Sequence, residues 1–215
     1  IDLNDMRFTK FIVQVGKNLI ENKMPDAHWL TELMERGARS VVIAPEYSPS
    51  ATKADYWISV RPGLSDTSIF LYVTRELMER GWYDADFVKQ FTDFPLLVRT
   101  DTLKRLKPGE VITGYTDKDI SAGPSFKIQG LTAAQRERLG DFLVHDLSSG
   151  QPRPISRDDV GRLIAEQKLD PALDWRGRVK LLDGSEVEVM TVWTMYREHL
   201  ADYTLATTAE ITGAS

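Results

Sequence analysis

Glycine, lysine and asparagine follow the first of three apolar segments near the start of the chain, a combination suited to an anionic ligand. Gly16 lets the backbone come close to a phosphate, while Lys17 and Asn18 supply an ammonium and an amide donor. The same triplet also serves as a plain strand-to-helix turn in which Gly and Asn adopt positive φ. Neither the Gly-x-Gly-x-x-Gly fingerprint of simple dinucleotide domains nor a Walker phosphate loop occurs in the chain. The triplet alone leaves both interpretations open.

Acidic side chains follow the second and third apolar segments. Glu46 comes about thirty residues after Gly16, in the role of the carboxylate that doubly wound folds place on a ribose diol. A solvated loop carboxylate is the alternative interpretation of Glu46. After Arg61-Pro62-Gly63, Asp66 can accept hydrogen bonds from the edge of a guanine or cap the helix behind it. The three loops together predict a nucleotide-type site.

The three apolar segments that precede these loops are expected to be parallel strands of one sheet. They are residues 11–15, 40–44 and 56–60. A helix with Asp26 as its N-cap and Gly37 as its stop separates the first two segments. Such strand-helix-strand units cross over right-handed, and ligands sit outside the carboxyl ends of the strands. We therefore expect the three loops to converge on one ligand.

The fold class indicated is α/β, with a parallel, doubly wound, Rossmann-like sheet that has helices on both faces. A helix from about Thr67 to Arg80, capped by Ser65 or Asp66, follows the third strand. Its expected buried stripe is Phe70, Val73 and Leu77. A short helix at residues 84–91, an extended segment at 93–101 and a division at Gly109 complete the first part, residues 1–109.

The second part, residues 110–215, is expected to be less regular α+β structure. It opens with a long surface excursion through Gly130. Residues 178–182 and 186–190, joined through Asp183-Gly184, form the clearest β-hairpin of the chain. The other expected elements are a helix from Thr132 to Val144, a loop at 148–154, a helix opened by a capping box at 156–159 and ended at Gln167, a helix at 191–203 and the start of another helix.

Composition excludes several function classes. The 215 residues are 42% hydrophobic and 27% charged, as in ordinary soluble globular proteins, and the net charge of -5 speaks against a nucleic-acid partner. The absence of cysteine excludes disulfides and Cys-held zinc or iron-sulfur clusters within these residues. His28, His145 and His199 show no metal-ligand spacing. We identify no catalytic nucleophile and base and no metal ligand, and no apolar run is long enough to span a bilayer.

Six motifs resemble, in order and spacing, the molybdopterin oxidoreductases of the dimethyl sulfoxide reductase superfamily. They are Gly16-Lys-Asn18, Pro25-Asp-Ala-His-Trp29, Pro45-Glu-Tyr47, Ala54-Asp-Tyr-Trp57, Arg61-Pro-Gly63 with Asp66, and Tyr83-Asp-Ala-Asp-Phe-Val88. Residues 25–28 and 92–101 resemble the catalytic alpha subunits of membrane-associated nitrate reductases and, more closely, of nitrite oxidoreductases. The resemblance spans residues 11–106 well. The expected hairpin, the helix after it and residues 209–213 resemble the family less specifically, as the lead into its next domain.

The resemblance implies a cofactor, molybdenum bis(molybdopterin guanine dinucleotide), with Asn18 at the pyrophosphate, Glu46 at the ribose and Asp66 at the guanine. The implied binding residues are Gly16, Lys17, Asn18, Glu21, Glu46, Tyr47, Arg61, Gly63, Ser65 and Asp66. Two departures stand out. The family usually has Gly-Ser-Asn in the first loop, where this chain has Gly16-Lys17-Asn18. In the third loop the family commonly has Gly-Thr-Asp, where this chain has Gly63-Leu64-Ser65-Asp66, so that either an extra residue or a shifted alignment leaves the partner of Asp66 open.

The resemblance further implies that the chain is an internal piece of a much larger catalytic subunit, inactive by itself. The molybdenum ligand and the 4Fe-4S motif are expected upstream. The implied reaction is nitrite oxidation to nitrate. Electrons are expected to leave through iron-sulfur clusters to a beta subunit and then to a membrane or haem subunit. The complex is expected to be associated with a membrane, on the periplasmic face in preference to the cytoplasmic face. A respiratory nitrate reductase or a chlorate- or selenate-reducing relative is the alternative. A stand-alone nucleotide-binding or structural module is the alternative of another class, and the gene upstream of Ile1 discriminates between them.

Overall fold

A computed structural model describes residues 3–63, 65–116, 140–156 and 161–214 of the chain. The chain divides into two compact units. The first unit comprises residues 1–77 and 200–215, and the second comprises residues 78–199. The expected division at Gly109 concerns domain limits in a larger subunit and stays a prediction.

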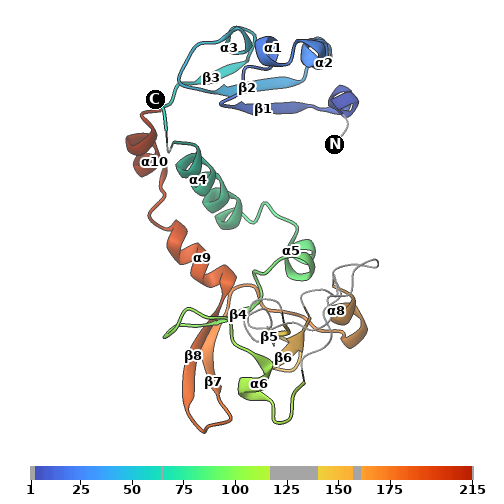
Figure 1. Cartoon of the computed structure of the whole chain (residues 1–215), viewed down its shortest axis with the longest axis vertical. Coiled ribbons are helices and arrows are strands. Elements are labelled where there is room, and N and C mark those ends of the chain that lie inside the picture. The colour runs from blue at the N-terminus through green and yellow to red at the C-terminus, as the bar shows by residue number, and fades with distance from the viewer. Residues whose placement is uncertain (1–2, 64, 117–139, 157–160, 215) are drawn as a thin grey trace. The chain divides into compact units, whose positions relative to one another are not determined.

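The first unit is built on a parallel sheet with the strand order β1-β2-β3 (Figure 1). The strands are β1 (Phe11–Val15), β2 (Arg39–Ile43) and β3 (Tyr56–Ile58), so the three expected strands are confirmed. Helix η1 (Leu3–Phe8) precedes β1, and three helices lie between the strands: α1 (Leu19–Asn22), α2 (Met24–Glu35) and α3 (Pro49–Thr52). Asp26 lies in the first turn of α2 rather than at its N-cap, which is Lys23.

Helices α1, α2 and α3 lie on one side of this sheet (Figure 1). The strand order does not reverse, and successive right-handed crossovers in one direction place their helices on the same face. Val42 on this face is fully buried in a cluster with Ala44 and Ala51. On the opposite face Phe11 and Val13 remain 57% and 43% exposed. A parallel α/β sheet is therefore present, whereas the second helical layer of a doubly wound fold stays a prediction.

Two further helices lie wholly or mostly in the first unit. Helix α4 (Ser65–Glu79) confirms the helix expected after the third strand, and α10 (Leu205–Thr212) ends the described chain. The expected buried stripe of α4 is wrong, because Phe70, Val73 and Leu77 are 52%, 41% and 39% exposed. An apolar period indicates which face of a helix is apolar, but burial also needs a surface to pack against.

The second unit contains two antiparallel sheets. Strands β4 (Leu97–Arg99), β8 (Glu186–Thr191) and β7 (Arg176–Lys180) pair in the order β4-β8-β7, and β5 (Phe142–Asp146) pairs with β6 (Gln151–Ile155). The expected hairpin is confirmed, with Gly184 at φ +87° in its turn. The helices are α5 (Ala85–Phe91), α6 (Pro108–Val111), α8 (Arg162–Gln167) and α9 (Val192–Leu200).

Two sequence-based expectations for the second unit are wrong. The end of the helix expected at residues 132–144 is strand β5 instead. Residues 132–139 of that expected helix lie outside the described part. A short, continuous apolar run fits a buried strand and a buried helix equally well. The expected loop at 148–154 contains β6, which tolerates Pro152 and Pro154 because it pairs on one side only. The expected capping box lies largely outside the described residues, and Gly161 is the N-cap of α8.

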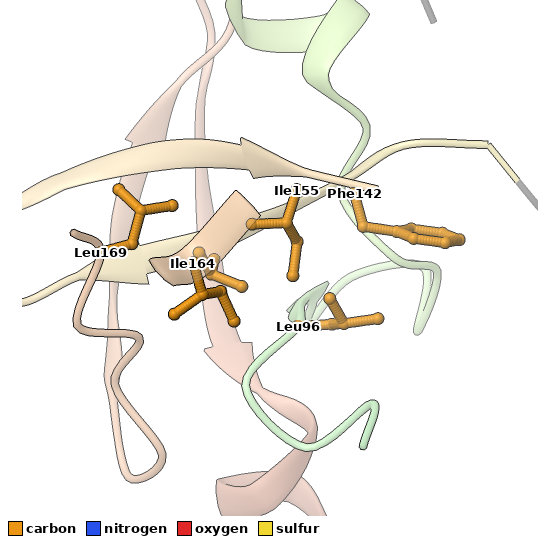
Figure 2. Packing of buried hydrophobic residues seen from close by; sticks show 6 residues of the cluster. Leu96, Phe142, Ile155, Ile164 and Leu169 are labelled. Atoms are coloured by element: carbon orange, nitrogen blue, oxygen red, sulfur yellow. The ribbon is translucent and has the colours of Figure 1, made fainter. Parts of the chain in front are cut away.

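Alternating side chains of adjacent strands feed two separate cores in the second unit. Leu96 and Phe142 contribute to one cluster, while their neighbours Leu97 and Leu143 contribute to another. Figure 2 shows the first cluster, in which side chains from separate segments meet: Leu96, Phe142, Ile155, Ile164 and Leu169. Successive strand side chains point to opposite faces, so one strand pair serves both clusters. This burial explains why β5 begins with three apolar residues in a row, Phe142 to Val144.

Candidate functional site

The three parallel strands end at a common edge. Val15 lies beside Ile43, and Ile43 beside Ile58, in the register of the sheet. The ladder continues into the loops, because the Gly16 N–H donates to the Ile43 carbonyl at 2.9 Å. The Ala44 N–H likewise donates to the Ile58 carbonyl at 3.2 Å. The structure thus brings the ends of all three strands side by side; the first two loops begin at this edge, and the third begins after Ser59 and Val60.

In the first loop, Gly16 and Asn18 have different tasks. Gly16 adopts φ +56° and no atom lies within 4 Å of the position that a Cβ would take. Asn18 is only 8% exposed, and its Oδ1 accepts hydrogen bonds from the Glu21 N–H at 3.4 Å and from the Ser50 hydroxyl at 3.0 Å. Its Nδ2 donates to the Glu21 carboxylate. Asn18 therefore joins the first loop to α3, while the half-buried Lys17 brings the charge.

The second loop presents polar and aromatic groups at its tip. Glu46 and Tyr47 are exposed, and Ser48 caps α3 by accepting a hydrogen bond from the Ala51 N–H. The Tyr47 ring makes an edge contact with Trp57, with ring centroids 4.9 Å apart. The Trp57 Nε1–H donates to the Ala44 carbonyl at 3.2 Å, which fixes the indole beside the strand end. Sequence reasoning placed Trp57 in a motif but gave it no role at the site.

The third loop turns at Gly63, which has φ +78°. The Ser65 hydroxyl donates to the carbonyl oxygens of Arg61 at 2.6 Å and of Gly63 at 3.1 Å, so Ser65 closes the turn. Asp66 is exposed in the first turn of α4, where the helix dipole favours a carboxylate. The Arg61 guanidinium contacts α10, because its Nη1 donates to the Glu210 carbonyl at 3.0 Å.

The groups on the three loops differ in how they can meet a ligand. Lys17 offers positive charge near open backbone at Gly16, and Glu46 and Asp66 offer acceptors. An ammonium suits a diphosphate, and carboxylates suit a sugar diol or the N–H groups of a guanine. Within the described residues, no three His, Asp or Glu side chains gather as a metal site. The donor set therefore fits the binding of a nucleotide, and we assign no reacting centre to these residues.

The second unit holds buried polar groups that serve its fold. Asp146 is 3% exposed, and burial alone would raise the pKa of its carboxyl. Hydrogen bonds from the Ser149 hydroxyl and from the backbone N–H groups of Asp170, Ser149 and Ser148 outweigh burial and hold that pKa below its usual value. Asp146 thereby fixes the turn after β5.

Comparison with known proteins identifies the family. No family model matches the chain. The chain is 32% identical over 211 residues to the perchlorate reductase alpha subunit of Dechloromonas aromatica (strain RCB), covering 95% of this chain and 22% of the relative. It is 31% identical over 195 residues to the respiratory nitrate reductase alpha subunit of Haloferax mediterranei, covering 90% and 18%. The chain belongs to the molybdopterin oxidoreductase alpha subunits.

Membership in the molybdopterin oxidoreductases confirms the resemblance drawn from the loop motifs, and it makes the chain part of an enzyme family. The chlorate reductase alpha subunit of Ideonella dechloratans is also similar, at 28% identity over 212 residues, covering 98% of this chain and 20% of the relative. The chain spans between 18% and 22% of the length of these three relatives. None of the helices in the described part of the chain has the length and apolar character needed to cross a membrane.

Proposed function

We propose that the chain is the segment of a molybdenum-dependent catalytic subunit that holds one guanine nucleotide arm of molybdenum bis(molybdopterin guanine dinucleotide). One observation carries the proposal: three parallel strand ends lie in register at one edge, each followed by a loop with donors or acceptors for a nucleotide. Ligands of open α/β sheets bind outside the carboxyl ends of the strands. The family membership supports this cofactor, and the donor set fits it.

Within this site the loops divide the recognition of the nucleotide. Lys17 and the Gly16 backbone would hold the pyrophosphate, Glu46 the ribose, and Asp66 the guanine. Tyr47 and Trp57 offer an aromatic surface at the same strand end. When bound, the molybdenum cofactor supplies oxygen-atom transfer coupled to two electrons. The residues of this chain bind and orient its nucleotide arm.

The remaining predicted site residues hold the loops in place. Asn18 accepts from α1 and α3, and Glu21 in turn accepts from the Asn18 amide. Ser65 closes the Gly63 turn ahead of Asp66. These contacts pre-organise the loops, so less ordering entropy is lost when the nucleotide binds.

The sheet itself supports a doubly wound domain in the full-length subunit. Phe11 and Val13 lie on the face opposite α1 to α3 and stay exposed. Parallel sheets occur almost only with both faces covered, so polypeptide outside these residues would supply the second layer of helices. Residues 1–109 would then belong to the cofactor-binding domain and residues 110–215 lead towards the next one.

Nitrite oxidation to nitrate is the reaction we propose first, on the motifs at residues 25–28 and 92–101. Respiratory nitrate reduction or chlorate reduction is the alternative, and it is favoured by the nitrate and chlorate reductases among the relatives. The purified full-length subunit distinguishes them. Nitrite-dependent reduction of an artificial electron acceptor supports the first reaction. Oxidation of a reduced viologen by nitrate or chlorate without nitrite oxidation supports the alternative.

Partners and location follow from this proposal. Electrons would leave through a 4Fe-4S cluster held elsewhere in the full-length subunit, then through an iron-sulfur beta subunit and a membrane or haem subunit. The complex would be membrane-associated and face the periplasm. Copurification of such subunits with the full-length chain tests this arrangement, and a chain that purifies alone from the membrane-free fraction counts against it.

The cofactor assignment is tested by replacing Asp66 with alanine in the full-length subunit. Its matched control is Asp86→Ala, since Asp86 is an exposed aspartate in the first turn of α5. We expect Asp66→Ala to lower the GMP released per subunit by acid hydrolysis, and Asp86→Ala to leave it unchanged. Unaltered GMP in Asp66→Ala contradicts the role of Asp66. A wild-type subunit without molybdenum and GMP contradicts the whole proposal and favours a stand-alone structural module.

A further inference from the structure

The third loop of the candidate site is bound to the last helix of the chain, about 150 residues away in sequence. The Arg61 N–H donates to the Thr212 carbonyl at 2.7 Å, and the Arg61 Nη1 donates to the Glu210 carbonyl at 3.0 Å. Both partners lie in the final turn of α10, and Thr212 is fully buried. Arg61 thus contacts α10 through both its backbone and its side chain.

These contacts satisfy the end of α10. The last carbonyl groups of a helix have no partner within the helix, and positive charge is favourable there because of the helix dipole. Arg61 supplies both a donor and a charge. Gly213 ends the helix with φ +69°, and its N–H donates to the Ala209 carbonyl at 2.7 Å. The helix end and the loop therefore stabilise each other.

Gly213 also permits the close approach of the Arg61 side chain. A Cβ at Gly213 would lie 2.9 Å from Arg61 Nε and 3.0 Å from Arg61 Cγ. Cβ atoms in proteins essentially never approach another heavy atom as closely as the first distance. Any side chain at this position would therefore push the Arg61 side chain away. Gly184 adopts a similar φ of +87° but has no atom within 4 Å of its Cβ position. An alanine would therefore strain the backbone at both positions, but only at Gly213 would it also collide with the Arg61 side chain.

The contact continues to the residue that we assign to the guanine. The Arg61 carbonyl accepts from the Ser65 hydroxyl at 2.6 Å, and Ser65 immediately precedes Asp66 at the start of α4. We propose that the C-terminal end of α10 is a positioning element of the nucleotide site, with Gly213 and Thr212 acting through Arg61 to hold Asp66 in its binding position. This inference rests on the proposed function. It makes Arg61 a positioning residue rather than a direct ligand of the cofactor.

The test uses the full-length subunit with Gly213→Ala, Arg61→Ala and the double variant, and Gly184→Ala as the matched control. We expect each of the first two variants to lower bound GMP per subunit roughly three- to tenfold, in line with the loss of a few hydrogen bonds. The double variant is expected to lose no more than the stronger single variant, because both changes remove the same contact. Arg61→Lys, which keeps the charge at the helix end, should recover part of the GMP.

Hydrogen exchange in peptides that contain Arg61 and Asp66 gives a second readout that does not depend on the cofactor. Faster exchange there in Gly213→Ala, but not in Gly184→Ala, supports the positioning role. Unchanged GMP and exchange in Gly213→Ala, equal effects of the two glycine variants, or additive losses in the double variant would each overturn it. If Gly213→Ala does not fold, equal GMP in Arg61→Lys and Arg61→Ala overturns it instead. If the wild-type protein contains no GMP, the proposed function is refuted but the positioning role is not. Hydrogen exchange then decides whether α10 positions the third loop.

Discussion

The Ser50 hydroxyl donates a hydrogen bond of 3.0 Å to Asn18 Oδ1, which joins the loop after β1 to the helix after β2. Ser50 is 1% exposed and also accepts from the Ile20 N–H at 3.2 Å. A loop residue and a helix residue that are 32 positions apart in sequence therefore share one buried polar contact. Because that contact lies at the edge where the nucleotide is proposed to bind, it couples the stability of the loops to the shape of the site.

Ser50→Ala is expected to destabilise the protein by about 1–3 kcal/mol, since it leaves the Asn18 oxygen and the Ile20 N–H short of a partner. Thermal or urea unfolding measures the loss. Thr52→Ala serves as the control, because Thr52 is exposed and its hydroxyl donates to the Pro49 carbonyl within the same short helix. A Ser50 variant as stable as the Thr52 variant would show that the contact contributes nothing.

Gly177→Ala is expected to destabilise the second unit by about 1–3 kcal/mol through overpacking. A Cβ at Gly177 would lie 2.5 Å from Cζ2 of the Trp175 ring. His145 stacks on that ring with a centroid distance of 4.0 Å, which limits how far the ring can move. Gly109→Ala is the control, because its Cβ would meet no atom within 4 Å. Equal unfolding midpoints for the two variants would contradict the packing argument.

His145, which stacks on Trp175, is expected to make the free energy of unfolding fall as the pH is lowered. Burial lowers the pKa of His145, with the nearby Asp146 carboxylate opposing that shift, and the His145 Nδ1 is buried without a partner among the described residues. The unfolded chain, with a His pKa of about 6.5, therefore takes up the proton more readily. Stability is full above about pH 6.5 and declines as the pH falls towards the lower pKa of the folded state.

Melting temperatures measured at about pH 7.5 and about pH 5.5 check this sign. His145→Phe keeps a ring on Trp175 without a titrating group, so we expect it to reduce the difference between the two melting temperatures. His28→Asn, a change at an exposed histidine of α2, is expected to leave the difference as it is in the wild type. The His145 prediction is wrong if the Phe variant shows the same acid loss as the wild type.

Val13→Lys tests whether the open face of the β1-β2-β3 sheet is covered in the full-length subunit. Val13 is 43% exposed in this chain, so a lysine there meets no steric obstacle. Under a second layer of helices the same change would bury an unpaired charge, and we expect a loss of several kcal/mol or of folded protein. Met24→Lys, at a residue 73% exposed at the start of α2, is the control. Equal yields and melting temperatures for the two variants would argue for an open face.

Local patterns foresaw the elements whose signals are local. Segments rich in β-branched residues predict β1 and β2, and the Asp183-Gly184 turn predicts the β7-β8 hairpin, since turn chemistry and strand propensity act over a few residues. For β5 the sequence predicts the wrong element, because the apolar run carries no period. For α4 it predicts the wrong burial, because burial depends on a partner surface, which no local pattern describes.

The sequence by itself determined the parallel strands, the loop chemistry and the family likeness, because each of these is written in residue types at short spacing. Only the tertiary structure decided that Asn18 is turned towards Ser50 and that Arg61 is engaged with Glu210 and Thr212. Those contacts join residues 32 and about 150 positions apart. Spacing along the chain cannot specify them, since they depend on how the strands and α10 meet in the folded unit.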